Sequence, residues 1–301
     1  MTTEVYVHVG LPKTATTFLQ KNIFSKYDGV SYCSTRYGAH HMFGETLALE
    51  STLMFAGVPF WNIEQTKGRV QKEVQRVPNG KILISREGFA GGAADNFRST
   101  SGFAYLLREV FVEPRVIFVF RKQEDWLISV FRQAVRAGIN QSAEDFYNFR
   151  GGNFEPPLSP APIGLDVLNL DWCNFIRFYN RLFGEANVLA LPFELFQQNP
   201  MTFVDKISVF LGVPSPAFDA GEKVNERDGA AFYAAQAGIN RLFSKKRRGR
   251  FRRILNLLQN IDGEVWSPLP QEGIEKIQEN RRKWTGPLSE LCKIDLKTIG
   301  Y

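Results

Sequence analysis

Short apolar segments alternate with amphipathic segments along the first two thirds of this chain. Segments rich in β-branched or aromatic residues, which predict strands, lie at 4–9, 81–85, 115–120 and 187–191. Apolar residues at helical spacing lie between them, at 65–77, 103–111, 126–135 and 168–183. The nearly continuous apolar run at 115–120 is typical of a parallel strand buried on both faces. This alternation predicts an α/β fold, a three-layer structure with helices on both faces of a parallel sheet.

The last third of the sequence has a helical pattern. It runs from about Pro200 to the end, with breaks at 212–214, 229 and 267–270. We therefore expect a single domain over 1–301, in which an α/β core at 1–212 carries a helical C-terminal extension at 213–301. Two further segments, 33–62 and 151–164, lack a regular pattern, and long loops of this kind often bind ligands.

Composition excludes several classes of protein. Hydrophobic residues make up 44% of the 301 residues and charged residues 23%, which is ordinary globular usage rather than disorder. The longest apolar run is six residues, at 230–235, whereas a membrane-spanning helix needs about 20. Three distant cysteines without metal-ligand spacing, and an N-terminus without a secretory signal pattern, predict a cytoplasmic protein.

The positive charge of the chain is concentrated in one short run. The formal net charge is +6, and residues 245–253 hold seven Lys or Arg and no acid, which leaves 6 − 7 = −1 for the rest. A local basic run predicts one anionic partner rather than general binding to nucleic acid. Three interpretations stay open: a solvated helix face, a contact with phosphate or an acidic glycan, and peripheral docking on the anionic inner membrane surface.

The loop after the first predicted strand is rich in Gly, Pro and Thr. It reads Gly10-Leu11-Pro12-Lys13-Thr14-Ala15-Thr16-Thr17, and helical spacing follows it. A strand, such a loop and a helix are the usual architecture for binding a phosphate. The nucleotide triphosphatase pattern G-x-x-x-x-G-K-S/T is not matched, because Lys13 follows Gly10 by three residues and no second Gly precedes it. A P-loop kinase-like phosphotransferase is therefore the weaker alternative, and we expect no metal.

Three motifs resemble the sulfotransferase family, whose members use 3′-phosphoadenosine 5′-phosphosulfate (PAPS). Pro12-Lys13-Thr14-Ala15-Thr16-Thr17, after His8-Val9-Gly10, resembles the 5′-phosphosulfate loop. The strand that ends in Arg121, with Ser129 eight residues later, resembles the second signature. Residues 183–194 and 210–212 resemble a later strand and helix of bacterial and carbohydrate sulfotransferases. The resemblance runs from residue 4 to about 212 and implies a P-loop-like sulfotransferase fold.

The resemblance also implies which residues hold the nucleotide. The loop residues Pro12, Lys13, Thr14, Ala15, Thr16 and Thr17 would bind the 5′-phosphosulfate. Arg121 and Ser129 would bind the 3′-phosphate, which suits the forked donors of Arg and one hydroxyl. Asn225 and Arg227 would lie in a late loop over the nucleotide. The family usually has Gly where this chain has Ala15, a small departure if the backbone there has a negative φ.

Sulfuryl transfer also needs a general base and a cation at the leaving oxygen. Related carbohydrate sulfotransferases place a catalytic Glu just past the second strand, where this chain has Glu87. Lys13 is the candidate cation. His40 and His41 are rival bases that could also reach the acceptor, and Arg86 and Arg98 are candidates for lining its site.

The resemblance therefore implies a sulfotransferase that uses PAPS and releases 3′-phosphoadenosine 5′-phosphate (PAP). The expected acceptor is a hydroxyl, or an amine, on a glycan, a glycolipid or a small metabolite. The non-enzyme alternative is a polyanion- or membrane-binding module on a nucleotide fold that has lost its ligand.

Overall fold

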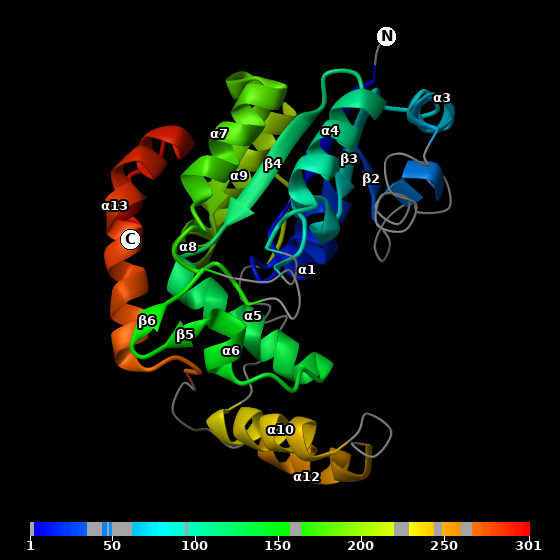
Figure 1. The fold of residues 1–301 in the computed structure, drawn as a ribbon. Coiled ribbons are helices and arrows are strands. Elements are labelled where there is room, and N and C mark those ends of the chain that lie inside the picture. The colour runs from blue at the N-terminus through cyan, green and yellow to red at the C-terminus, as the bar shows by residue number, and fades with distance from the viewer. Residues whose placement is uncertain are drawn as a thin grey trace. The chain divides into compact units, whose positions relative to one another are not determined.

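The computed structural model has a parallel sheet at its centre (Figure 1). It describes residues 3–34, 44–46, 48–49, 62–93, 96–156, 164–219, 229–243, 249–259 and 267–301. The strands lie in the order β2-β3-β1-β4-β7, and every pair of neighbours is parallel. Their bounds are β1 (Glu4–His8), β2 (Ser31–Cys33), β3 (Lys81–Ser85), β4 (Arg115–Phe120) and β7 (Val188–Pro192). Four of these five strands are the ones that the sequence predicts.

Helices follow the predicted pattern between and after the strands. Their bounds are α1 (Thr16–Phe18), continued by the π-helix η1 (Leu19–Ile23), α3 (Ile63–Val74), α4 (Thr100–Val110), α5 (Gln123–Ala137), α6 (Ala143–Tyr147), α7 (Trp172–Phe183), α8 (Phe193–Gln198), α9 (Pro200–Leu211), α10 (Ala230–Leu242), α12 (Arg252–Gln259) and α13 (Gln271–Cys292). Helix α7 begins four residues later than predicted, because the Asp171 side chain accepts from the Cys173 N–H at 2.7 Å and caps the helix.

Helices cover both faces of the sheet. On one face α4 contacts α3 and α7, and the Phe118 ring of β4 stacks on Phe175 of α7, with centroids 5.7 Å apart. On the other face Phe18 of α1 contacts Phe196 of α8, and the hydroxyls of Tyr27 and Ser208 are hydrogen-bonded at 2.8 Å. The predicted three-layer α/β architecture is confirmed.

The sequence patterns missed the short elements. Strand β2 has three residues, which is too few for a periodic pattern to show. The turn and second strand of the hairpin of β5 (Phe149–Arg150) and β6 (Asn153–Phe154) lie where we expected the irregular segment 151–164 to begin. Gly151 and Gly152 form its turn with φ of 54° and 77°, the left-handed values that a tight two-residue hairpin turn requires.

The contacts within the chain divide it into two compact units. The first holds the sheet and spans Met1–Lys122, Asp171–Glu222 and Trp284–Tyr301, and the second spans Gln123–Leu170 and Lys223–Lys283. Within the second unit Arg281 binds both carboxylate oxygens of Glu124, at 2.9 and 3.0 Å, and both side chains are buried. The single domain expected from the sequence stays a prediction.

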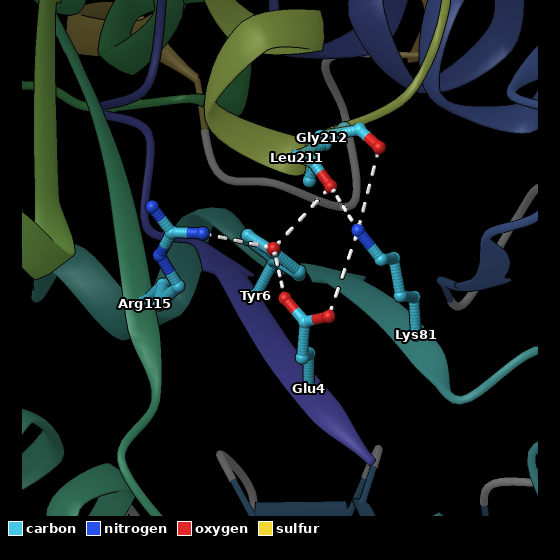
Figure 2. A network of polar contacts seen from close by, with 6 residues as sticks. All are labelled: Glu4, Tyr6, Lys81, Arg115, Leu211 and Gly212. Atoms are coloured by element: carbon cyan, nitrogen blue, oxygen red, sulfur yellow. Dashed lines mark hydrogen bonds and ion pairs between the residues drawn. The ribbon is translucent and has the colours of Figure 1, made fainter.

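A polar network closes the N-terminal edge of the sheet (Figure 2). Tyr6 donates to a Glu4 carboxylate oxygen at 2.6 Å and accepts from Arg115 at 2.9 Å. Burial, with the Glu4 bond, raises the pKa of Tyr6 to about 12. Lys81 donates to the Leu211 carbonyl at 2.7 Å, which places a cation at the C-terminus of α9. This network binds α9 to the amino edge of the sheet.

No helix in the described ranges is both long enough and apolar enough to cross a bilayer.

Candidate active site

The predicted site segments leave the sheet at one edge. Strands β1 and β3 end side by side, with His8 opposite Ser85, and the Arg86 N–H donates to the His8 carbonyl at 3.2 Å. On the other side of β1, the chain continues along β4, where the Leu11 N–H donates to the Val119 carbonyl at 3.4 Å. The loop after β1, Glu87 after β3 and Arg121 after β4 therefore all start at the carboxyl edge, where open α/β sheets bind ligands.

The loop after β1 is shaped by two residues in the left-handed region. Lys13 has φ 69° and Ala15 has φ 60°. The condition of a negative φ at Ala15 is therefore not met, because the chain turns through a left-handed residue just before α1 begins at Thr16. A left-handed residue with a Cβ costs about 1–2 kcal/mol, so Ala15 occupies a position that favours Gly.

The loop side chains differ in what they can offer a ligand. Lys13 is exposed, and Pro12 and Thr17 are half-buried. Thr14 is buried and donates its hydroxyl proton to the Leu11 carbonyl at 2.6 Å, so this proton serves the loop itself. The Thr16 hydroxyl is also buried, and no hydrogen-bond partner for it exists among the described residues.

Arg121 is buried and held against the loop. Its Nη1 donates to the Lys13 carbonyl at 3.2 Å, and its guanidinium carbon lies 5.0 Å from the centroid of the Phe193 ring. The Arg121 carbonyl accepts from the Trp172 indole at 2.8 Å. Both the side chain and the main chain of Arg121 are therefore fixed beside the loop.

Glu194 is a buried carboxylate near Arg121, and the sequence analysis assigned it no role. Glu194 accepts from the Lys122 N–H and from the Tyr301 hydroxyl, each at 3.0 Å. Burial raises the pKa of Glu194, and the nearby Arg121 charge acts in the opposite direction. The sequence showed Glu194 inside a family-like motif, but its partner Tyr301 lies 107 residues away and nothing local signals the contact.

The acceptor-side candidates lie in the same unit as the loop. Glu87 is half-buried and begins a short 3-10 helix (Glu87–Ala90), directly after half-buried Arg86. Arg98 is exposed in the turn before α4. The structure thus brings the Glu87 segment beside the end of β1.

The remaining candidates belong to the second unit or lie outside the described residues. Ser129 is half-buried on α5, which begins two residues after Arg121 and belongs to the second unit. His40, His41, Asn225 and Arg227 lie outside the described residues. Within the described part of the chain, no group of three or more His, Cys, Asp or Glu side chains is arranged to hold a metal ion.

A protein-family model described as the sulfotransferase domain matches residues 6–227. The chain belongs to the sulfotransferase family. This sulfotransferase is therefore an enzyme of the sulfuryl-transfer class. PAPS is the sulfuryl donor that its family uses. No curated protein matches the sequence.

Several solved structures of sulfotransferases are distantly similar. One from Alicyclobacillus acidocaldarius is 15% identical, with 83% of this chain and 100% of that chain covered and a TM-score of 0.46. The sulfotransferase domain of the Synechococcus olefin synthase is 12% identical, with 92% and 94% covered and a TM-score of 0.40. A mouse sulfotransferase complexed with PAP is 14% identical, with 97% and 87% covered and a TM-score of 0.41.

Proposed function

We propose that this sulfotransferase binds PAPS at the loop 10–17 and Arg121 and transfers a sulfuryl group to an acceptor hydroxyl or amine. The contact between Arg121 and the Lys13 carbonyl carries the proposal, because it joins the two cationic residues of the motif at one edge of the sheet. The donor set fits a nucleotide with two anionic groups, with the Lys13 ammonium exposed and the Arg121 charge buried.

Each residue has a distinct proposed role. When bound, PAPS would supply an activated sulfuryl group on a phosphate that becomes the leaving group. Lys13 would neutralise the negative charge that develops there, and Arg121 would hold the 3′-phosphate. Glu87 would accept the acceptor proton as general base. Thr14 would act by shaping the loop, because its hydroxyl already donates to Leu11.

Other assignments in this proposal rest on the resemblance. Ser129 on the 3′-phosphate, and Asn225 with Arg227 over the nucleotide, stay predictions. His40 and His41 stay the rival bases, and Arg86 and Arg98 stay candidates for acceptor contacts.

The Glu87→Gln variant tests the base. It keeps the shape of the side chain and removes its basicity, so we expect PAP affinity to hold while kcat falls by about 10²–10⁴-fold. Glu64→Gln is the matched control, because Glu64 is exposed on α3 and should change neither quantity. Retained activity in Glu87→Gln would move the base role to His40 or His41.

The alternatives make different predictions in solution. A kinase-like phosphotransferase would turn over ATP with Mg²⁺ and would not need PAPS. A non-catalytic module would bind polyanions and produce no sulfated product. A glycan, glycolipid or small-molecule acceptor is identified by screening acceptors against PAPS turnover.

The basic run supports a second, peripheral function, docking on an anionic membrane. Arg250 and Arg253 are exposed, and Ile254 and Leu257 on α12 are 54% and 75% exposed beside them. Exposed apolar and cationic side chains on one helix suit an anionic membrane surface. Flotation with liposomes containing an anionic lipid tests this: Leu257→Glu should abolish binding, and equal flotation of both proteins contradicts it.

A further inference from the structure

A network of hydrogen bonds between His8, Ser85 and Gln20 lies beneath the loop after β1. His8, the last residue of β1, is fully buried, and its Nδ1 lies 2.9 Å from the Ser85 hydroxyl at the end of β3. Gln20 on η1 donates from Nε2 to the Ser85 hydroxyl at 3.0 Å and to the Ser85 carbonyl at 3.3 Å. This network thus joins β1, before the loop, and η1, after it, to the end of β3, the strand that leads to Glu87.

We assign the ring proton of His8 from the partners of the Ser85 hydroxyl. The Gln20 Nε2 can only donate, so the Ser85 oxygen accepts from it. Among the described residues, His8 Nδ1 is the remaining partner for the Ser85 hydroxyl proton. In this assignment Nδ1 accepts the hydroxyl proton, and the ring proton lies on Nε2. Burial lowers the pKa of His8 to about 3, which keeps the ring neutral.

The other edge of the His8 ring lies against Gly10. A Cβ on Gly10 would stand 2.6 Å from His8 Cε1, even closer to Nε2, and 3.3 Å from the Thr16 hydroxyl. The His8 Nε2 and Thr16 Oγ1 atoms are both buried and have no hydrogen-bond partner within the described ranges. The imidazole therefore fills the space directly below the turn that begins the loop.

We infer that His8 is a positioning residue, a neutral spacer that Ser85 and Gln20 lock in place to set the loop against the strand end bearing Glu87. The inference rests on the proposed function, in which the loop holds the donor and Glu87 receives the acceptor proton. A misplacement of about 1 Å between such groups can cost about 10²-fold in rate. A neutral His8 would itself exchange no proton during the reaction.

The Gln20→Met variant tests the positioning role. Met keeps the length of the side chain but cannot donate to Ser85. We expect kcat to fall about tenfold or more, with PAP affinity and the shape of the pH–rate profile unchanged. Gln71→Met, a half-buried position on α3, is the matched control and should keep full kcat. An unchanged kcat in Gln20→Met, whatever its melting temperature, would overturn the inference.

A double-mutant cycle tests the contact between His8 and Gly10. Gly10→Ala forces a methyl group into the imidazole, and His8→Ala removes the imidazole. If the two substitutions acted independently, their effects on the unfolding equilibrium constant would multiply. We expect the double variant to favour the folded state at least about tenfold more than this product. Additive effects would contradict the spacer role.

A spectroscopic readout separates this inference from the proposed function. Imidazole ¹⁵N chemical shifts of the wild-type protein should show a neutral His8 ring with its proton on Nε2. A charged ring, or a proton on Nδ1, would overturn the inference even if the enzyme is active. If the protein does not bind PAP, the proposed function fails, while the shifts and the cycle still decide the role of His8.

Discussion

Arg121 donates a hydrogen bond from Nη1 to the main-chain carbonyl of Lys13 at 3.2 Å, across 108 residues of sequence. The bond ties the end of β4 to the loop after β1. Two cationic residues that the sequence motifs name separately thus become parts of one arrangement. The position of the loop and the position of Arg121 therefore depend on each other.

Arg121→Lys should weaken PAP binding by about 100-fold, because Lys keeps the charge but loses the forked donors and cannot hold Lys13 in the same way. Isothermal calorimetry with PAP measures this loss. Arg108→Lys on the exposed face of α4 is the control and should bind as the wild type does. Equal affinity of both variants would remove Arg121 from the site.

Ala15→Gly should stabilise the protein by about 1 kcal/mol, because Gly adopts the φ of 60° at this position without strain. Urea unfolding measures the change. Ala134→Gly is the opposite control: it lies inside α5, where Gly costs about 0.5–1 kcal/mol relative to Ala. Destabilisation by Ala15→Gly would show that the left-handed turn does not exist.

Local sequence predicted four strands of the sheet, the long helices and the loop, because each of these depends on neighbours in the chain. The β4 residues 115–120 predict a buried parallel strand by their apolar run alone, and the structure has that strand. Ala15 shows the limit: the residue type is favourable for negative φ, and the left-handed turn at Lys13 and Ala15 overrides it.

Contacts between distant residues could not be predicted in this way. The hydrogen bond from Tyr301 to Glu194 and the hydrogen bond between His8 and Ser85 join different elements, and no periodicity or motif marks them. The fold has to bring these residues together before their chemistry appears. Only the structure shows that His8 contacts Ser85 and lies against the turn at Gly10.

Arg281→Met should destabilise the protein by about 3–5 kcal/mol, because it leaves the Glu124 carboxylate buried without its two donors. Chemical denaturation measures the loss. The double variant Glu124→Gln/Arg281→Met also removes the unpaired buried charge and should recover part of the lost stability. A loss below about 1 kcal/mol for Arg281→Met would show that this pair is solvated.

The stability of the wild-type protein should fall as the pH drops below about 6.5, where the unfolded chain gains a proton on His8. The folded state resists that proton, because burial lowers the pKa of His8 to about 3. By pH 5 the loss from this group should reach about 2 kcal/mol.

The matched comparison is His8→Gln, whose stability should lack this part of the pH dependence. Unfolding curves recorded at several pH values between 5 and 8 measure the difference between the two proteins. Parallel pH profiles would show that His8 is accessible to protons in the folded state.

Calorimetric titration of the wild-type protein with PAP tests the central claim most directly. The account predicts saturable binding to a single site, weakened in both Lys13→Ala and Arg121→Ala, and heat exchange with the Glu87→Gln variant equal to that of the wild type. Absence of binding to the wild-type protein, or binding that both substitutions leave intact, would contradict it.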